Sequence, residues 1–529
     1  MHRHDENYWY NKLTMYYLWG GTKNMRRMLT KRKLRQLDLL EALFYSKNRE
    51  LHENLITNQF NITERILKND IDAIHTKIDY LHISKNDNYY ALDIKNNYSI
   101  DKVYKDFLQE SNGFRLLDYL FKNNKLGSED LENKLFLSAS SVYRIVDSLN
   151  KILEENYGVT ISTNPYQIIG DEYHIRYFFI KYYTEAYSIF EWPFEDIDED
   201  KIKAICLFFL DLVSMEVDVY TLRQFSFEAA ISIIRKKNGH PYNSDDRQST
   251  AIFDQIKADE PELLKTFEAK FGFKLTLEFA TNFGAIFANN SFNYSYDSLW
   301  NSVQEKPHDA DALRHLKKLL AALQDAFDLP LKNEDELILE LYNIVAIETR
   351  TNSKPYLIYP HYAAFDNQIN NRFPDFHKEV KEGLNKYLLL LVGDYPKELL
   401  NAVIYTFYLY WDQLFVYLEQ IVEPIKTLVI SDYNQRHAMV MKDMLEHEYA
   451  TQLSVDIWES KDLSRENIAS SEYELIVAGF SLENFEDKYC ISLNNLPTIN
   501  DFHDISEIIN TIKKRASYEK DDLSDIRFI

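Results

Sequence analysis

The fold is decided by one stretch of the sequence, Leu135-Phe136-Leu137-Ser138-Ala139-Ser140-Ser141-Val142-Tyr143-Arg144. It lies inside residues 126–177, where the pattern predicts a short helix, a tight turn, a longer helix and a β-hairpin. Ser138 is expected to cap the longer helix, because a hydroxyl can accept an otherwise unpaired backbone N–H. One apolar face follows at the helical period and consists of Val142, Ile145, Val146, Leu149, Ile152 and Leu153.

This order of elements is typical of a winged helix-turn-helix. The opposite face of the longer helix is polar and carries Ser140, Ser141, Tyr143, Arg144, Asp147, Ser148 and Lys151. The N-terminal end of a recognition helix is the part that enters the major groove of DNA. The alternative is an ordinary amphipathic helix with a solvated face. On the first interpretation we predict DNA contacts from Ser140, Ser141, Tyr143, Arg144 and Lys151.

A second helix-turn-helix is predicted upstream, in residues 34–80. Two helices near residues 34–44 and 51–56 precede a long one whose apolar face holds Leu67, Ile71, Ile74 and Ile78. Asn61 and Glu64 have the spacing of a capping box at its start. A hairpin with strands at residues 81–83 and 89–92 would form the wing. The polar face of the long helix offers Thr63, Arg65, Lys68, Asn69, Asp72 and His75, and we predict DNA contacts from Thr63, Arg65, Lys68 and Asn69.

Charge is distributed unevenly along the chain. The 529 residues carry a formal net charge of −23. Residues 1–180 hold 25 Lys and Arg against 24 Asp and Glu, whereas the remainder holds 35 against 59. Because binding to a polyanion needs only a locally basic face, the first third can bind DNA despite the acidic total. The acidic remainder should repel nucleic acid.

The N-terminal segment contains aromatic residues followed by a basic cluster. Residues 1–28 show no motif, so we expect a poorly ordered arm there, with Met28 as an alternative native start. The cluster Lys31-Arg32-Lys33, with Arg26, Arg27 and Arg35 nearby, is either a solvated tail or a phosphate-contacting segment. Only two cysteines occur, and no signal peptide or membrane-length apolar run is visible, so a reducing, cytoplasmic location is predicted.

The rest of the chain changes pattern twice. A helix is expected over 101–124, ahead of the motif at 126–177. Between residues 177 and 421 only helices are expected, at 177–190, 202–215, 225–237, 249–271, 275–289, 310–327, 333–348, 373–391 and 399–421. After Pro424, apolar runs at 425–430, 452–458, 475–479 and 490–493 alternate with helices at 436–447 and 505–515, which favours a small parallel α/β sheet. The chain lacks the common nucleotide-binding, hydrolase and zinc-protease motifs, so no enzyme activity, cofactor or metal is predicted.

Two helix-turn-helix patterns, each followed by a hairpin, make a specific resemblance visible. The run from Leu126 to Phe178, including Phe136-Leu137-Ser138-Ala139-Ser140-Ser141-Val142-Tyr143-Arg144, Pro165-Tyr166-Gln167-Ile168-Ile169-Gly170-Asp171-Glu172 and Ile175-Arg176, resembles the Mga-type family of transcription regulators. These are similar to regulators with phosphotransferase regulation domains (PRDs), which the bacterial phosphotransferase system governs. The resemblance extends from about Leu29 to Lys514.

The resemblance implies a mostly α, multidomain fold. It consists of two winged helix-turn-helix domains, two all-helical PRDs and a small C-terminal α/β domain like a phosphotransferase IIB component. The implied division is an arm at 1–28, winged domains at 29–98 and 99–177, PRDs at 178–292 and 293–422, the IIB-like domain at 423–517 and a tail at 518–529.

The IIB-like domain departs from its pattern at one point. A IIB component has its phosphorylatable Cys directly after the first strand, whereas this chain has Ser431-Asp432-Tyr433-Asn434 there. Cys490 belongs to a later strand and is expected to be buried as a small apolar residue. We therefore expect this domain to keep the fold, to carry no phosphate and to contact another subunit.

PRDs, by the same resemblance, are regulated by phosphorylation of histidine. The candidates are His240, which is expected to be exposed at a helix end beside Gly239 and Pro241, His361 in the loop 359–362, and His377. His240 is the best placed of the three. Gln224-Phe225 stands where the usual pattern has a further His, and the alternative for each candidate is a surface or capping residue.

The resulting prediction is a cytoplasmic transcription regulator, an activator on balance. Its partners would be double-stranded promoter DNA, phosphocarrier proteins of the phosphotransferase system, and further copies of itself in a homodimer or higher oligomer, with no membrane contact. Two alternatives stay open: a phosphotransferase-linked interaction module without specific DNA binding, and an RNA antiterminator. The latter is disfavoured because PRD antiterminators have a small β-rich RNA-binding module.

Overall fold

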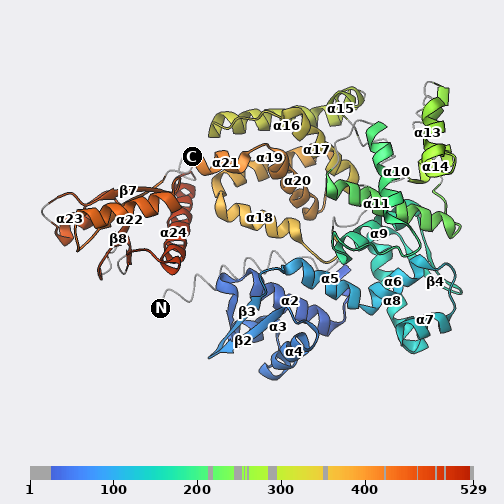
Figure 1. Cartoon of the computed structure of the whole chain (residues 1–529), viewed down its shortest axis with the longest axis horizontal. Helices are drawn as coiled ribbons and strands as arrows, with labels where there is room; N and C mark the ends of the chain where they lie inside the picture. The colour runs from blue at the N-terminus through green and yellow to red at the C-terminus, as the bar shows by residue number, and fades with distance from the viewer. Residues whose placement is uncertain are drawn as a thin grey trace. The chain divides into compact units, whose positions relative to one another are not determined.

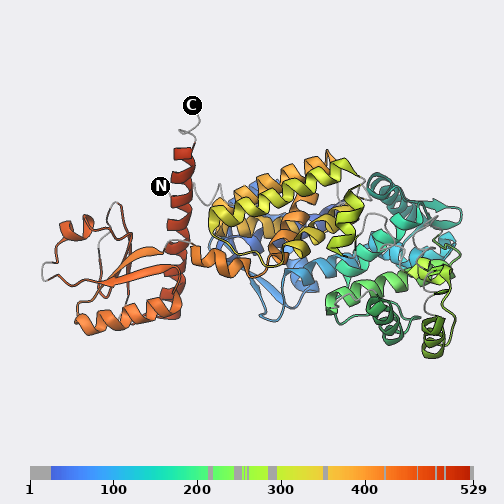
Figure 2. The same ribbon diagram turned by 90° about the horizontal axis from the view of Figure 1, so that it is seen from above.

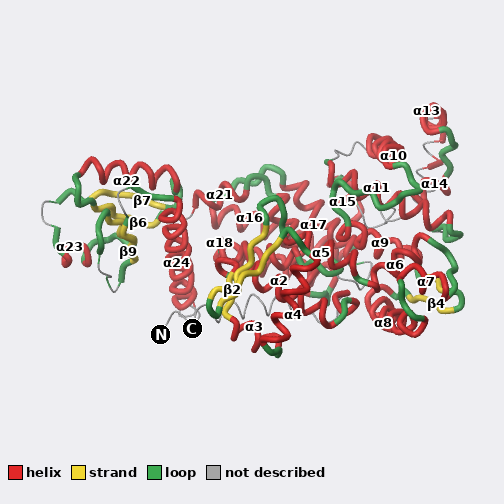
Figure 3. Tube along the Cα trace, turned by 60° about the horizontal axis from the view of Figure 1, so that its bottom comes forward, coloured by secondary structure: helices red, strands yellow, loops and turns green. Residues whose placement is uncertain are grey.

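The computed structural model describes residues 25–212, 218–242, 253–254, 257–258, 261–283, 293, 295–304, 306–349, 356–421, 424–460, 463–482, 485, 487–493 and 496–524. The remainder of the predicted arm, residues 1–24, lies outside the described residues. The chain forms two compact units, one made of residues up to 306 with 339–364 and 395–403, the other of 307–338, 365–394 and 404 onward. The predicted class is confirmed: the described chain is mostly helical, with strands in three small sheets (Figure 3).

The elements of the first winged helix-turn-helix are present as predicted (Figure 1). They are α2 (Lys31–Tyr45), α3 (Glu53–Phe60), α4 (Glu64–Lys77) and the hairpin of β2 (Leu81–Asn86) and β3 (Tyr89–Ile94). A strand that the sequence analysis missed, β1 (Glu50–His52), pairs antiparallel with β3. The predicted capping box is wrong: Asn61 ends α3 in the left-handed conformation, and Thr63 caps α4 by accepting the N–H of Ile66.

The second winged helix-turn-helix follows the prediction closely. Its helices α7 (Ser128–Leu135) and α8 (Ala139–Tyr157) precede the hairpin of β4 (Thr160–Thr163) and β5 (Tyr166–Ile169). Ser138 caps α8 and accepts the N–H of Ser141 at 3.3 Å, as expected. The single helix expected over 101–124 is instead two, α5 (Ile100–Glu110) and α6 (Asn112–Lys122), because the backbone is extended at Ser111.

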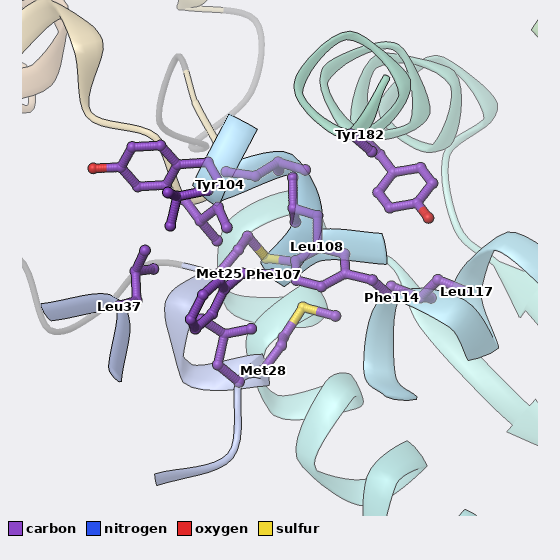
Figure 4. Packing of buried hydrophobic residues seen from close by; sticks show 14 of the residues in the cluster. Met25, Met28, Leu37, Tyr104, Phe107, Leu108, Phe114, Leu117 and Tyr182 are labelled. Carbon is purple, nitrogen blue, oxygen red and sulfur yellow. The ribbon is translucent and has the colours of Figure 1, made fainter. Parts of the chain in front are cut away.

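One apolar core runs through both winged domains and into the helices after them. Figure 4 shows part of it, with Met25 and Met28 lying among Leu37, Phe107 and Leu108. Residues 25–28, which we assigned to the arm, form the short 3-10 helix η1 (Met25–Met28) and are largely buried. This part of the prediction is wrong, and a chain starting at Met28 would lack the buried side chains of Met25 and Arg26.

The next helices continue the same unit. They are α9 (Glu172–Ala186), α10 (Glu199–Leu212), α11 (Val219–Lys237), α13 (Pro261–Phe271), α14 (Leu277–Phe283) and the unpredicted α15 (Tyr296–Val303). Parts of the predicted helices 202–215, 249–271 and 275–289 lie outside the described residues. Helix α9 has buried aromatic side chains around most of its circumference, including Tyr177, Phe178, Phe179, Tyr182 and Tyr183. It therefore acts as a central element of the core.

Six further helices precede the C-terminal sheet. They are α16 (Pro307–Phe327), α17 (Glu334–Glu348), α18 (His361–Arg372), α19 (Pro374–Val392), α20 (Lys397–Tyr410) and α21 (Leu414–Ile421). Helices α16 and α19 pack closely because Gly383 has no side chain to meet Leu319. Two expectations fail here. His361 begins a helix instead of lying in a loop, and the helix expected over 399–421 is broken by Gln413, whose φ is 57°.

The C-terminal α/β domain has the predicted parallel sheet, in the order β7 (Leu453–Ile457), β6 (Ile425–Ile430), β8 (Leu475–Ala478), β9 (Tyr489–Ser492). Helices α22 (Gln435–Glu448) and α24 (Ile499–Ser524) cover one face through Met441, Leu445, Ile505 and Ile509. The red helix α24 lies beside the strands in Figure 2 and extends into the predicted tail. Cys490 is only half-buried, contrary to expectation, because it lies in the edge strand β9. None of the described helices combines the length and apolar character that crossing a bilayer requires.

Candidate nucleic-acid interface

The two helix-turn-helix motifs correspond position by position. Each turn has one residue in the left-handed conformation, Asn61 at φ 50° and Phe136 at φ 56°. Two residues later a hydroxyl caps the second helix, from Thr63 in the first motif and from Ser138 in the second. The same spacing then gives the buried positions Leu67, Ile71 and Ile74 in α4, and Val142, Val146 and Leu149 in α8. The motifs are therefore two copies of one geometry.

The predicted DNA-contacting side chains lie on matching exposed faces. Arg65, Lys68 and Asn69 of α4 occupy the same positions as Ser140, Tyr143 and Arg144 of α8. All of the predicted residues are exposed except Ser141, which is half-buried. Within the described residues, Arg65, Lys68 and Arg144 form no ion pair, whereas Lys151 is bonded to Asp147 at 2.7 Å. Their exposure is the condition that a groove-reading helix must meet.

A basic groove of about 660 Å³ joins the two motifs. Its lining includes Arg144, Ser141 and Ser148 of α8 on one side, and residues of α2 and α4 on the other. Five cations line it, against the single carboxylate of Glu110: Arg27, Arg32, Lys33, Lys77 and Arg144. A surplus of cations along one groove suits a phosphate backbone.

Four of the five cations already have carboxylate partners. Arg27 is 3.2 Å from Glu155, and Arg32 is 3.1 Å from the buried Asp70. Lys33 and Lys77 share Glu110; burial would raise the pKa of this carboxyl, but their hydrogen bonds lower it overall. Arg144 bonds only to uncharged groups within the described residues, the carbonyl of Ser140 at 3.2 Å and the Ser141 hydroxyl at 3.4 Å.

Each wing is fixed to its motif by a polar contact. In the first motif, Lys85 of the wing bonds to Glu53 of α3 at 2.7 Å. In the second, the amide of Asn150 in α8 accepts the N–H of Ile161 at 2.6 Å and donates to its carbonyl at 3.0 Å. The recognition helix and the wing of the second motif are thus held as one rigid surface.

The three candidate phosphorylation sites are all less accessible than expected. His377 is fully buried, with Nδ1 3.2 Å from the Tyr408 hydroxyl and Nε2 3.1 Å from Asp366. Burial lowers the pKa of His361 to about 4, and its Nδ1 lies 3.2 Å from the Tyr359 carbonyl. His240, predicted to be exposed, is half-buried, because the turn after α11 packs against the segment that follows α6.

His240 lies where the second winged domain meets the next helices. Its Nε2 is 3.3 Å from the amide oxygen of Asn124, and the Asn124 side chain donates to the carbonyl of Asn238 at 2.5 Å. Burial lowers the pKa of His240, and the nearby Arg235 adds to this effect. The ring is therefore uncharged near neutral pH, as a phosphoacceptor nitrogen must be.

A buried ion cluster supports this junction. Arg235 makes two bonds to the carboxylate of Glu172, at 2.9 and 2.8 Å, and Arg176 bonds to the same carboxylate at 3.0 Å. Arg176 is fully buried and also donates to the carbonyl of His240. The pairing with Arg235 could not be predicted from the sequence, because 63 positions separate it from Glu172.

A second network fixes the first winged domain to residues 357–359. The buried Glu41 accepts two bonds from Arg26, whose Nε donates to the carbonyl of Ile358 at 2.9 Å. The carboxylate of Glu185 accepts the consecutive backbone N–H groups of Leu357, Ile358 and Tyr359. Burial raises the pKa of Glu185, but three amide donors and Lys181 stabilise its charged form. Arg26, which we had counted in the basic cluster, is thus a structural residue.

The fold and this interface define the class of the protein, a helix-turn-helix DNA-binding transcription regulator. Residues 96–183 match the family model of the Mga helix-turn-helix domain, and residues 199–414 match that of the PRD domain of the M protein trans-acting positive regulator. The chain belongs to the Mga-type family of PRD-containing regulators, as the resemblance indicated.

Relatives with described roles agree with this membership. A candidate trans-acting regulator of Streptococcus pneumoniae serotype 4 is 26% identical over 479 residues, which cover 90% of this chain and 97% of the relative. The capsule synthesis positive regulator AcpA of Bacillus anthracis is 26% identical over 39% of this chain and 43% of its own length. AcpB of the same organism, also a capsule synthesis positive regulator, is 22% identical over 44% and 49%.

Proposed function

We propose that this protein is a transcription activator that binds double-stranded promoter DNA through α4 and α8 together. The observation that carries the proposal is the basic groove between the two motifs, with Arg144 free of any carboxylate among the described residues. Activation, as opposed to repression, is supported by the two relatives described as positive regulators. Phosphates would fix the register, and the exposed side chains of both helices would read the bases.

Duplex binding by the full chain at several salt concentrations tests this proposal. Arg144→Ala should weaken binding about tenfold and reduce the slope of log affinity against log salt by about one, because one phosphate-directed cation is lost. Arg314→Ala is the matched control, since Arg314 is an exposed arginine of α16, far along the chain from both motifs. Wild-type protein without salt-dependent affinity for any duplex would overturn the proposal.

We further propose that phosphorylation by the phosphotransferase system acts through His240. Among the three candidates, His377 has both ring nitrogens occupied and His361 is held at the start of α18, whereas His240 lies at a half-exposed turn. A phosphoryl group on Nε2 would add about −1.5 to −2 charges. It would replace the contact with Asn124 and lie near Glu172, so the junction with the second winged domain would loosen.

Chemical phosphorylation of the full chain with phosphoramidate, followed by mass spectrometry, tests the order of reactivity. We expect modification of His240 first and none of His377 in the folded protein. The modified protein should show faster hydrogen exchange in α6 and α11, and His240→Ala should abolish that change. Modification confined to His361 or His377 would contradict the assignment.

Three further features complete the proposal. The chain is proposed to act in the cytoplasm and to form a homodimer or higher oligomer through the C-terminal α/β domain. Its domains are proposed to divide at the boundaries given above, except that residues 25–28 belong to the first winged domain. Oligomerisation is supported by the loop Ser431-Asp432-Tyr433-Asn434, which keeps the IIB position without its cysteine. Sedimentation of the full chain, with and without residues from 425 onward, tests the oligomer.

A further inference from the structure

Phe136 has an unusual position in the turn between α7 and α8. Its side chain is 89% exposed, although Leu135 before it is buried and Leu137 after it packs against the core. Its backbone is left-handed, with φ 56° and ψ 46°. The backbone therefore directs this one aromatic ring outward, immediately ahead of the recognition helix.

The first motif provides an internal comparison for this residue. Asn61 occupies the same place, two residues before the helix cap, with φ 50° and ψ 52°. Asparagine tolerates the left-handed conformation, whereas a bulky aromatic residue is strained there. An exposed phenylalanine also leaves its apolar surface in water. The turn itself thus does not require a phenylalanine. Neither its left-handed backbone nor its exposed ring stabilises the isolated chain.

We propose that Phe136 is an apolar DNA contact that packs against the 5-methyl group of a thymine in the major groove. This inference rests on the proposed function. The N-terminal end of a recognition helix enters the major groove, and Phe136 is two residues ahead of the cap Ser138. The thymine methyl is the apolar group that a base pair presents in that groove, and phenylalanine is among the side chains that contact it.

The neighbours of Phe136 in sequence are suited to the polar part of the same contact. Ser140, Tyr143 and Arg144 project from the first turns of α8 and offer hydroxyl and guanidinium donors. A ring at the turn would add discrimination between thymine and uracil, because contact with the 5-methyl group is something that these polar donors cannot provide. The first motif, with Asn61 at the turn, would lack this discrimination.

Replacing Phe136 by the residue of the first motif tests the proposal. The full chain and its Phe136→Asn variant are titrated with an A·T-rich duplex and with the same duplex containing deoxyuridine in place of every thymidine, which removes only the methyl groups. Wild-type protein should bind the thymidine duplex roughly tenfold more tightly, as expected for burial of part of a phenylalanine ring. The variant should bind both duplexes equally, with an unchanged salt slope and an unfolding midpoint no lower than that of wild type.

The matched control is Phe190→Asn, because Phe190 is an equally exposed phenylalanine (95%) outside both motifs. It should leave both affinities unchanged. The inference is overturned, while the proposed function stands, if the Phe136→Asn variant keeps the preference for thymidine. It is also overturned if the only change in this variant is weaker self-association in sedimentation. Wild-type protein that binds neither duplex overturns the proposed function itself.

Discussion

The two helix-turn-helix motifs have the same geometry but use their polar residues differently. In the first, the buried Asp70 of α4 binds Arg32 and Arg35 of α2, so these two cations are satisfied within the protein, whereas Arg65 and Lys68 on the exposed face of α4 have no ion pair among the described residues. In the second, Arg144 and the serines at the start of α8 have no charged partner among the described residues. The difference teaches that two motifs with the same fold can have different roles in binding DNA. We propose that the first motif mainly positions the protein on DNA and that the second mainly reads bases.

The largest expected effect concerns the buried anchor of the first motif. Glu41→Ala would leave Arg26 buried without its main partner, so the unit containing the winged domains should lose about 3–5 kcal/mol of stability. Chemical denaturation combined with hydrogen exchange of α2 measures the loss. A change below about 1 kcal/mol would mean that Arg26 can reach solvent, contrary to its buried position.

A smaller effect should follow when the charges of the first motif are released. Asp70→Asn removes the partner of Arg32 and Arg35, which should cost about 1–3 kcal/mol of stability. The freed arginines should then make the salt dependence of duplex binding steeper by up to about two units of slope. Anisotropy titrations at several salt concentrations provide the measurement. An unchanged slope would show that these two arginines do not face DNA and would weaken the comparison.

The stability of the first motif should also depend on pH through Asp38. Burial, reinforced by Glu41, raises the pKa of Asp38 to about 7. The folded state therefore holds this proton more tightly than the unfolded chain does, so stability falls as pH rises from about 4 to about 7 and is constant above that. Asp38→Asn should remove a fall on the order of 2–3 kcal/mol, seen by comparing denaturation at about pH 5 and about pH 8. Parallel curves for wild type and variant would contradict the assignment.

The smallest effect is expected at the surface of the second motif. Asp147 and Lys151 form an exposed pair one turn apart in α8. Asp147→Ala should change stability by less than about 0.5 kcal/mol, because exposed pairs of this kind contribute little. Thermal unfolding of the full chain checks this. A larger loss would indicate that the pair fixes the recognition helix, which would make the two motifs more alike than we propose.

The sequence predicted most of what depends on local periodicity. The helix cap at Ser138, the apolar faces of α4 and α8, both hairpins and the parallel C-terminal sheet were all expected and are present. The failures share a physical cause. Asn61 has a capping residue's chemistry but a left-handed backbone, and the interruptions at Ser111 and Gln413 lie within continuous apolar patterns that periodicity cannot divide.

The candidate site was less predictable because burial depends on residues that are distant in sequence. His377 looked like any polar helix residue, yet Asp366 and Tyr408 enclose it. Arg26 looked like part of a basic tail, yet it contacts residues more than 300 positions away. The sequence does contain a signal for Phe136. When the two motifs are aligned at the caps Thr63 and Ser138, a phenylalanine stands in the second motif where the first has Asn61.

The backbone amides of residues 357–359, which bind Glu185, limit how the chain can be cut into stable fragments. Leu357 and Ile358 complete a core that begins at Met25, so a fragment cut after α9 would lack two side chains of that core. Such a fragment would also leave the guanidinium of Arg26 without one acceptor and the carboxylate of Glu185 without its cradle. The two winged domains are therefore not expected to fold independently of the rest of the chain. Any event that displaces residues 357–359 would disturb their core directly, because these residues are part of it.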